Sequence, residues 1–379
     1  MVAIGWLLLA CGPSAPRCHF GTEHPIYSSS GENLDDVALA LTGEGAIVFF
    51  SEPSGAYARA LDTLGSPTGP ITRIGPQCDA GLSAAVSGSA LRPAANSGKP
   101  IEFACARRTN SQTDQAGGLS LYVLDEHLRV QHVERFGRVG PNSHGVALAR
   151  GGDGLTIAWQ DADLEGARIW LKHGSTPEIA VSDPAFAASA PGLAFQAKRL
   201  FATWAESRDE HGHVESRVRL ADASQPSAAQ TIALSRDRWP SPDLATSPQG
   251  VWLAFRDRRK AAHRTGLYLE RLDPAGKPIG LPVRAARADG VGRPVLRPCL
   301  GGVLAATPRT FAGDYFVGVV RADADLETLS GEQQFYEDSH EFAQVASTCA
   351  GDHALLVMAE RARLGRGHAA LRSVSFVCD

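Results

Sequence analysis

Residues 57–69 read YARALDTLGSPTG, and residues 268–280 read YLERLDPAGKPIG. In both segments Tyr, Leu, Asp, Gly, Pro and Gly recur at the same spacings. Each copy follows an apolar run, 46–50 or 251–255, and has the composition of a short strand that ends in a Pro/Gly turn. A strand-and-turn unit that recurs in this way predicts stacked or radially arranged sheets.

The unit can be followed along the chain by the small apolar residue that begins its first strand. These residues are Val37, Leu82, Val146, Leu193, Leu244, Leu296 and Val345. Five of the six intervals lie between 45 and 52 residues, and the sixth is 64 residues long because of polar stretches that we expect to be loop insertions. Turns containing glycine and second apolar strands follow the starts, and no stretch sustains a helical period.

Seven units of about four strands predict an all-β fold, namely a seven-bladed β-propeller of four-stranded antiparallel blades around a central channel. Only 34 residues follow Val345, which is enough for three strands. We therefore expect the N-terminal segment around residues 19–27 to add the fourth strand and close the ring, which removes exposed sheet edges. Regular short strands are also typical of sandwiches, so a pair of β-sandwiches is the alternative.

The cysteines test this arrangement independently. Setting Cys11 aside leaves six, an even number that fits three disulfides in an oxidising compartment. The propeller frame selects three pairs: Cys18–Cys378, which would lock the ring, Cys78–Cys105 within one unit, and Cys299–Cys349 between neighbouring units near the channel. A buried, unpaired thiol is the alternative for any one of them. The spacings do not match a zinc site, so we expect no metal.

Residues 8–11, LLAC, resemble the lipobox of bacterial lipoproteins, in which a peptidase cuts before a cysteine that carries diacylglycerol. The resemblance implies lipidation of Cys11 and a location on the bacterial cell envelope, facing the periplasm or the exterior. The expected organisation is a signal peptide at 1–10, a lipidated tether at 11–17 and a single propeller domain at 18–379. Residues 1–9 contain no Lys or Arg, so a stray thiol at Cys11 is the alternative.

Composition limits the partners. A net charge of −4 and a pI near 6.3 argue against a nucleic-acid binder. The basic cluster of Arg256, Arg258, Arg259 and Lys260 is split by Asp257, and we interpret it as a solvated hairpin turn. No phosphate-binding loop, dinucleotide motif or H-E-x-x-H pattern occurs, so we expect no cofactor. We expect a monomer that touches the membrane only through its lipid anchor.

A periodic acidic position is the main candidate for a binding face. It lies two residues after the last bulky apolar side chain of the second strand, in five units: Glu52, Asp161, Glu206, Asp257 and Glu360. Carboxylates gathered around one rim of a propeller are suited to holding a cation or to hydrogen-bonding sugar hydroxyls, and we expect the protein or glycan partner to dock on this face. The alternative is that each acid caps its own hairpin or pairs with a nearby arginine such as Arg208, Arg256 or Arg361.

Two segments have sequence features of metal sites, but neither predicts one. Residues 161–166, DADLEG, are similar to the start of an EF-hand loop, but Lys172 stands where a bidentate Glu is needed. His211 and His213 with nearby glutamates have side chains that suit zinc or copper. A polar surface hairpin explains the same residues.

The repeated strand and turn also make the chain similar to uncharacterised secreted bacterial β-propeller proteins. This resemblance implies a surface location but no particular activity. We therefore expect a platform that binds a protein or a glycan. The alternative is a sialidase-like or other glycoside-cleaving hydrolase, but the S-x-D-x-G-x-T-W turns expected of sialidases are absent, and we favour a binding protein over an enzyme.

Overall fold

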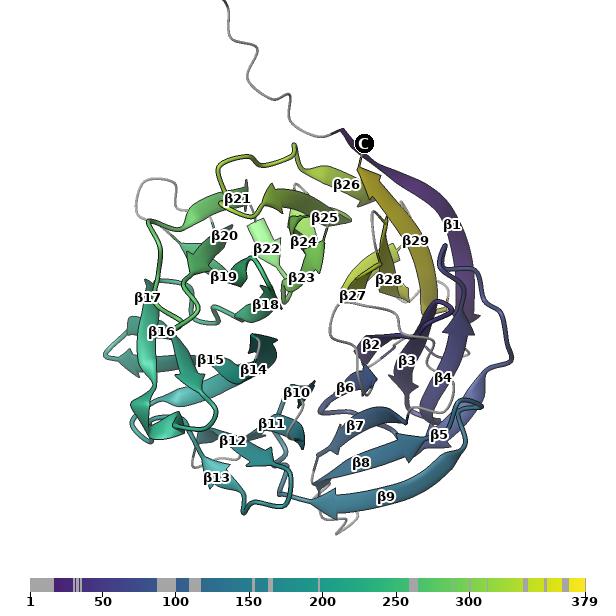
Figure 1. The fold of residues 1–379 in the computed structure, drawn as a ribbon, viewed down its shortest axis with the longest axis horizontal. Coiled ribbons are helices and arrows are strands. Elements are labelled where there is room, and N and C mark those ends of the chain that lie inside the picture. Colours follow the sequence, from purple (N-terminus) through teal and green to yellow (C-terminus); the bar gives the residue numbers. More distant parts are fainter. Residues whose placement is uncertain are drawn as a thin grey trace, which may run out of the picture.

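The computed structural model describes most of the chain. The residues are 17–29, 31, 34, 36–86, 100–108, 117–151, 154–162, 166–196, 198–258, 265–287, 289–299, 301–311, 313–336, 340–350, 353–362 and 368–378. Seven antiparallel sheets form a ring around a central channel (Figure 1). In these residues the only helix is a three-residue 3-10 turn, η1 (Pro226–Ala228). The predicted propeller is confirmed, and the pair of sandwiches is wrong.

Each blade consists of strands that follow one another from the channel outward. Blade 1 contains β2 (Asp36–Leu41), β3 (Ala46–Glu52), β4 (Gly55–Leu61) and β5 (Thr72–Gly75). Blade 2 contains β6 (Gly81–Val86), β7 (Ile101–Arg107), β8 (Gly118–Leu124) and β9 (Val130–Phe136). Blade 3 contains β10 (Val146–Gly151), β11 (Gly154–Ala162), β12 (Ala167–His173) and β13 (Ile179–Ala180). Blade 4 contains β14 (Ala187–Gln196), β15 (Arg199–Glu210), β16 (His213–Asp222) and β17 (Gln230–Ser235).

Blade 5 follows the same plan, whereas blades 6 and 7 depart slightly from it. Blade 5 contains β18 (Asp243–Ser247), β19 (Gly250–Arg258), β20 (Thr265–Leu272) and β21 (Val283–Arg287). Blade 6 has its inner strand in two pieces, β22 (Asp289–Val291) and β23 (Val295–Cys299), followed by β24 (Gly302–Phe311), β25 (Asp314–Asp323) and β26 (Gln333–Tyr336). Blade 7 contains β27 (His340–Ala350), β28 (His353–Ala362), β29 (Ala370–Cys378) and, as its outer strand, β1 (Cys18–Ser28).

The N-terminal strand closes the ring, as predicted. β1 pairs antiparallel with β29 from Cys18↔Cys378 to Ser28↔Ala370, and the two strands lie side by side in Figure 1. The Cys18–Cys378 disulfide joins the ends of this pair, with a Cα separation of 4.0 Å. Closure therefore depends on hydrogen bonds along the strands and on one covalent bond.

The two other predicted disulfides are also confirmed. Cys78–Cys105 and Cys299–Cys349 have Cα separations of 5.2 and 5.5 Å. Such bonds are typical of proteins that mature in an oxidising compartment. Among the residues that the structure describes, no helix is long and apolar enough to cross a membrane. The expected lipidation site, Cys11, lies outside the described residues.

The hydrophobic core is divided into seven clusters, one at each interface between neighbouring blades. Second strands supply the largest buried side chains, among them Trp159, Trp204 and Trp252. Between blades 1 and 2, Phe49 and Phe103 stack with ring centroids 4.9 Å apart. Alternate side chains of a strand point to opposite faces of a sheet, so each central strand of a blade supplies two interfaces.

Neighbouring inner strands are joined by two equivalent aspartates. Asp36 begins β2 and accepts a hydrogen bond from the backbone N–H of Leu82 on the next inner strand, at 2.9 Å. Asp243 begins β18 and accepts one from Leu296 N at 2.8 Å. These bonds align the inner strands, which all begin at one end of the channel. We call this end the entry mouth and the other end the exit mouth.

Candidate functional site: the entry mouth of the channel

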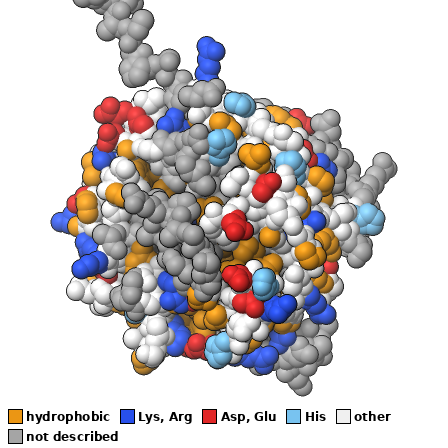
Figure 2. Space-filling view, turned by 45° about the vertical axis from the view of Figure 1, so that its right-hand side comes forward, with side chains coloured by type: hydrophobic (Ala, Val, Ile, Leu, Met, Phe, Trp, Pro, Cys, Tyr) orange, Lys and Arg blue, Asp and Glu red, His pale blue; other side chains and the backbone are white. Residues whose placement is uncertain are grey.

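The channel is a cavity of about 2040 Å³ lined by the inner strands of all seven blades. Its described lining residues include five arginines and three aspartates but no lysine or glutamate, so the lining carries a net charge of +2 while the whole chain carries −4. The charged lining residues are Asp36, Asp79, Arg108, Arg150, Asp243, Arg293, Arg297 and Arg361. Over the part of the outer surface shown in Figure 2, acidic and basic side chains are interspersed. Arg150 is paired with the buried Glu102 and Arg297 with Asp243, so an anion is attracted mainly to the other lining arginines.

Irregular inner strands shape the entry mouth. β14 bulges between Ser189 and Gly192, where Ala190 has a φ of +53°. β22 and β23 both pair with β24 but are separated by a break at residues 292–294. Such irregularities turn the local backbone and re-aim side chains, and they are common beside binding sites.

Arg293 lies in the break of the blade 6 inner strand and extends across the mouth. Its Nη2 donates a hydrogen bond to the carbonyl oxygen of Pro191, in the blade 4 bulge, at 2.7 Å. A Cβ atom built on Gly145, at the start of blade 3, would lie 3.4 Å from Arg293 Nη1. The Arg293 guanidinium therefore lies next to the blade 3 entry, where His144 precedes Gly145.

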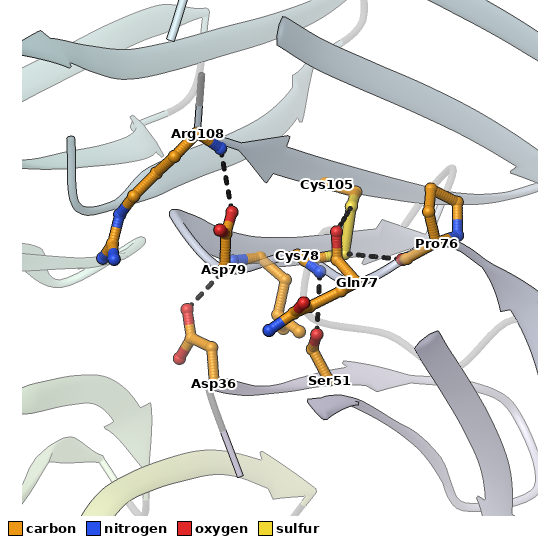
Figure 3. Close-up of a disulfide and its surroundings, with 9 residues drawn as sticks. Asp36, Ser51, Pro76, Gln77, Cys78, Asp79, Cys105 and Arg108 are labelled. Carbon is orange, nitrogen blue, oxygen red and sulfur yellow. Dashed lines mark hydrogen bonds between the residues drawn. A yellow bond between two sulfur atoms is a disulfide. The ribbon is translucent and has the colours of Figure 1, made fainter. Parts of the chain in front are cut away.

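Arg108 reaches the same place from blade 2. Its Nε donates to the Ser143 carbonyl oxygen at 3.0 Å, and its Nη2 lies 2.7 Å from His144 Nδ1. The Arg108 backbone N–H donates to Asp79 Oδ1 at 2.8 Å. Figure 3 shows the guanidinium extending away from the nearby disulfide. Arg108, His144 and Arg293 thus come from three blades, and we call them the cationic group after the two guanidinium groups that flank the imidazole.

The Cys78–Cys105 disulfide supports this arrangement. Cys78 directly precedes Asp79, and Cys105 lies three residues before Arg108. The Cys78 N–H also donates to Ser51 Oγ of blade 1 at 2.8 Å, as Figure 3 shows. The disulfide therefore fixes the blade 2 connection against the end of β7 and holds Asp79 and Arg108 in register.

His144 is held in its neutral form. Burial lowers its pKa, and the positive charge of Arg108 lowers the pKa further, while Asp79 acts in the opposite direction. A neutral imidazole has one nitrogen free to accept a hydrogen bond, and here Arg108 is within reach. An anion placed against the cationic group would reverse the balance and favour the protonated ring.

Trp239 supplies an apolar surface at the same mouth. It lies in the connection from β17 to β18, lines the cavity and keeps 45% of its surface exposed. Neighbouring Asp237 and Pro240 are buried, which turns Trp239 outward. The Arg238 guanidinium lies 5.8 Å from the centroid of the indole ring. An exposed indole beside cationic groups suits a ligand with both an apolar face and a negative charge.

The aspartates of the channel are largely occupied by the fold. Asp36 and Asp243 accept the inter-strand hydrogen bonds described above, and Asp243 Oδ2 also lies 3.2 Å from Arg297 Nη1. Asp79 Oδ1 accepts from Arg108 N. The described residues that line the cavity include no Glu and no Tyr. Glycoside hydrolysis generally requires two cooperating carboxylates, or a Tyr nucleophile in sialidases.

The five periodic acids lie elsewhere. Glu52, Glu206, Asp257 and Glu360 are buried, and Asp161 is half-buried. None of the five is among the residues that line the cavity. The structure therefore does not bring these carboxylates together on an accessible rim.

Four of these acids bind the connection that arrives from the preceding blade. Glu52 accepts from Ser29 Oγ at 2.6 Å, Asp161 from Gly140 N at 2.8 Å, Glu206 from Asp183 N at 2.8 Å and Asp257 from Arg236 N at 3.0 Å. The fifth, Glu360, lies 3.2 Å from Arg372 Nε within its own blade. Four of these partners belong to the connection between blades, which differs from the alternative stated above, in which each acid caps its own hairpin or pairs with a nearby arginine.

Glu52 illustrates how such a buried acid stays ionised. Burial opposes ionisation, but hydrogen bonds from Ser29, Ser54 and Tyr27 outweigh it and lower the pKa of Glu52. Burial and the same carboxylate raise the pKa of Tyr27 to about 12. The pair therefore contributes stability at neutral pH that is lost as the pH falls through the Glu52 pKa.

No group of three or more His, Cys, Asp or Glu side chains within the described ranges is arranged to hold a metal ion. His211 and His213 are exposed at the β15–β16 hairpin, and residues 163–165 of the EF-hand-like segment lie outside the described residues.

Sequence reasoning missed the cationic group and Trp239. A usable signal was present in Ala190-Pro191-Gly192 and Gly292-Arg293-Pro294, because proline and glycine inside an inner strand indicate a bulge or break. The convergence of Arg108, His144 and Arg293 from three blades had no local signal.

Comparisons with known proteins identify an architecture. No family model matches the chain, and no curated protein matches it. A neuraminidase-like protein from A/bat/Guatemala/164/2009 superposes with a TM-score of 0.50, at 10% identity over 94% of each chain. An endo-arabinanase of glycoside hydrolase family 43 from Bacillus licheniformis gives 0.32, at 15% identity over 60% of this chain and 91% of its own. Trypanosoma rangeli sialidase in complex with sialic acid gives 0.43, at 9% identity over 95% of this chain and 59% of its own. At these identities the likeness extends to the propeller fold alone.

Proposed function

We propose that this protein is an extracytoplasmic carbohydrate-binding propeller that holds an acidic sugar at the entry mouth of its channel. The observation that carries the proposal is the cationic group of Arg108, His144 and Arg293 in the same cavity as the exposed indole of Trp239. Guanidinium groups bind carboxylates through paired, charge-assisted hydrogen bonds. An indole face packs against the C–H face of a sugar ring.

Binding is favoured over hydrolysis. Two of the three lining aspartates accept hydrogen bonds from the backbone of a neighbouring inner strand, and the described lining offers no glutamate or tyrosine. A sialidase-like or other glycoside-cleaving activity is the alternative. Release of the fluorophore from 4-methylumbelliferyl sialoside or arabinoside, above a heat-denatured sample, would establish that alternative instead.

The binding proposal is tested by calorimetric titration of the propeller with digalacturonate and with sialyllactose, against neutral galactobiose. We expect the two acidic sugars to bind and galactobiose to bind at least about tenfold more weakly. Arg293→Gln should remove most of this preference, because it removes the charge that faces the sugar acid. Arg73→Gln, an exposed arginine on β5 at the outer rim, is the matched control. Equal affinity for acidic and neutral sugars would contradict the proposal.

We also propose that Cys11 carries the lipid anchor that displays the propeller on a bacterial cell envelope. The LLAC sequence supports this address, and the three disulfides fit an oxidising compartment. Each buried methylene of an acyl chain contributes about 0.8 kcal/mol to membrane binding. The wild type should therefore fractionate with membranes, and Cys11→Ala should remain uncleaved or be released. Identical fractionation and processing of both would contradict the anchor.

A further inference from the structure

A basic strip leads outward from the entry mouth over blade 5. Arg236 and Arg238 in the β17–β18 connection and Arg258 at the end of β19 are all exposed. None of the three forms an ion pair within the described part of the chain. The strip ends at Trp239, which lines the cavity.

Backbone contacts make the strip continuous. Arg256 N donates to the Pro240 carbonyl oxygen at 2.8 Å, and Arg236 N donates to Asp257 Oδ1 at 3.0 Å. The end of β19 therefore runs beside residues 236–240, and Arg258 follows Asp257 at the exposed end of that strand. Arg236 lies three positions before Trp239, a distance of at most about 11 Å along the chain.

The acids near the strip do not neutralise it. Asp237 is buried and pairs with Arg256 at 3.1 Å, and Asp257 is buried beneath Arg236. On the adjacent hairpin, Glu210 and Glu215 both pair with Arg208. The strip therefore presents toward solvent three guanidinium groups that form no ion pair with the described residues, together with one exposed indole.

We infer that the strip of Arg236, Arg238, Arg258 and Trp239 binds the continuation of a polyanionic polysaccharide whose acidic end occupies the entry mouth. This inference rests on the proposed function and specifies its substrate class as an extended acidic chain rather than a single sugar. Guanidinium groups spaced along a path match charges repeated along a uronate or sulfated polymer. The net charge of −4 disfavours indiscriminate attraction of polyanions to the rest of the surface.

The test compares oligogalacturonates of two and eight units by calorimetry. The variant R236Q/R238Q/R258Q, which we call the track variant, removes the three arginine charges of the strip. The matched control is R73Q/R129Q/R135Q, which removes three exposed arginine charges from the outer rim of blades 1 and 2. We expect the octamer to bind the wild type and the control about tenfold more tightly than the dimer. In the track variant the two lengths should bind within about twofold, and the salt dependence of octamer binding should be shallower.

The outcomes separate the two proposals. Dimer binding that is lost in Arg293→Gln, together with octamer binding unchanged by the track variant, would overturn the strip and leave the mouth site standing. An octamer that binds through the strip while the dimer binds none of the proteins would overturn the mouth site alone. An oligothymidylate with eight phosphates that binds the wild type as tightly as the octamer would overturn the assignment to a polysaccharide.

Discussion

Polar side chains have opposite roles at the blade interfaces and at the entry mouth. At the interfaces a carboxylate recurs at one position of the repeat and is buried against the connection from the preceding blade, as Glu206 shows. At the mouth, Arg293 comes from a broken inner strand and Trp239 from a connection, and both face the cavity. The comparison teaches that polar positions which obey the repeat hold the ring together, whereas positions that depart from it form the candidate site.

The largest expected effect is at a blade interface. Glu206 is fully buried and binds Asp183 N, Trp204 Nε1 and Arg217 Nε at 2.7 to 2.8 Å. Glu206→Ala leaves two N–H groups without their acceptor and removes one of the two carboxylates that pair with the half-buried Arg217, so the free energy of unfolding should fall by about 3–5 kcal/mol in urea denaturation. Glu210→Ala, which removes an exposed ion pair of the same strand, should cost less than about 1 kcal/mol. Similar losses of unfolding free energy in the two variants would contradict this prediction.

The two disulfides within the ring should also differ in their effects on stability and on ligand binding. Removing Cys78–Cys105, which closes a separation of 27 residues, should lower the free energy of unfolding by about 3–4 kcal/mol. Because this bond holds Asp79 and Arg108 at the mouth, Cys78→Ala/Cys105→Ala should also weaken digalacturonate binding. Cys299→Ala/Cys349→Ala is the control, because that disulfide lies at the exit ends of the inner strands. It should lose stability but keep affinity, and equal affinity in the two double variants would contradict the prediction.

A mouth residue should show the reverse behaviour. Trp239→Ala should weaken acidic-sugar binding about tenfold, or about 1.4 kcal/mol. The residue is 45% exposed, so the free energy of unfolding should fall by about 1–2 kcal/mol, less than in Glu206→Ala. Titration and urea denaturation of the same preparation measure both quantities. A stability loss without an affinity loss would place Trp239 with the interface residues.

The smallest expected effect is a pH dependence. Burial and Arg108 depress the pKa of His144 in the free protein, so the neutral ring contributes stability at neutral pH that is lost as the pH falls through this lowered value. A bound carboxylate favours protonation, and sugar acids remain ionised well below the histidine range. Affinity should therefore rise a few-fold between pH 7.5 and pH 5.5. His144→Gln should give a flat profile, and a rise that persists in this variant would assign the effect to another group.

Much of the fold could be predicted from the sequence because it depends on short-range patterns. Apolar strand starts at regular intervals fixed the number of blades, and the lack of a fourth strand after Val345 identified β1 as the closing strand. Once the blades were placed, the cysteines could be paired, because strand register limits which Cα atoms approach each other.

The repeat itself is more regular in space than in sequence. Gly65 and Gly276 occupy positive-φ positions in the two visible copies, at 94° and 85°. Leu128 and Leu326 take the same position in blades 2 and 6, at 62° and 60°, three residues after Asp125 and Asp323. Both leucines are buried in blade interfaces, and this burial offsets the backbone strain that normally selects glycine.

The sequence by itself determined the seven blades, the closing strand and the three disulfides, because each follows from periodicity and chain connectivity. It also located the periodic acids, but only the tertiary structure decided that four of them serve the connections between blades. The cationic group and the strip beside Trp239 were likewise decided in three dimensions. Their members lie far apart in the chain and are brought together by ring closure and by inner-strand bulges, which depend on packing between blades rather than on any local pattern.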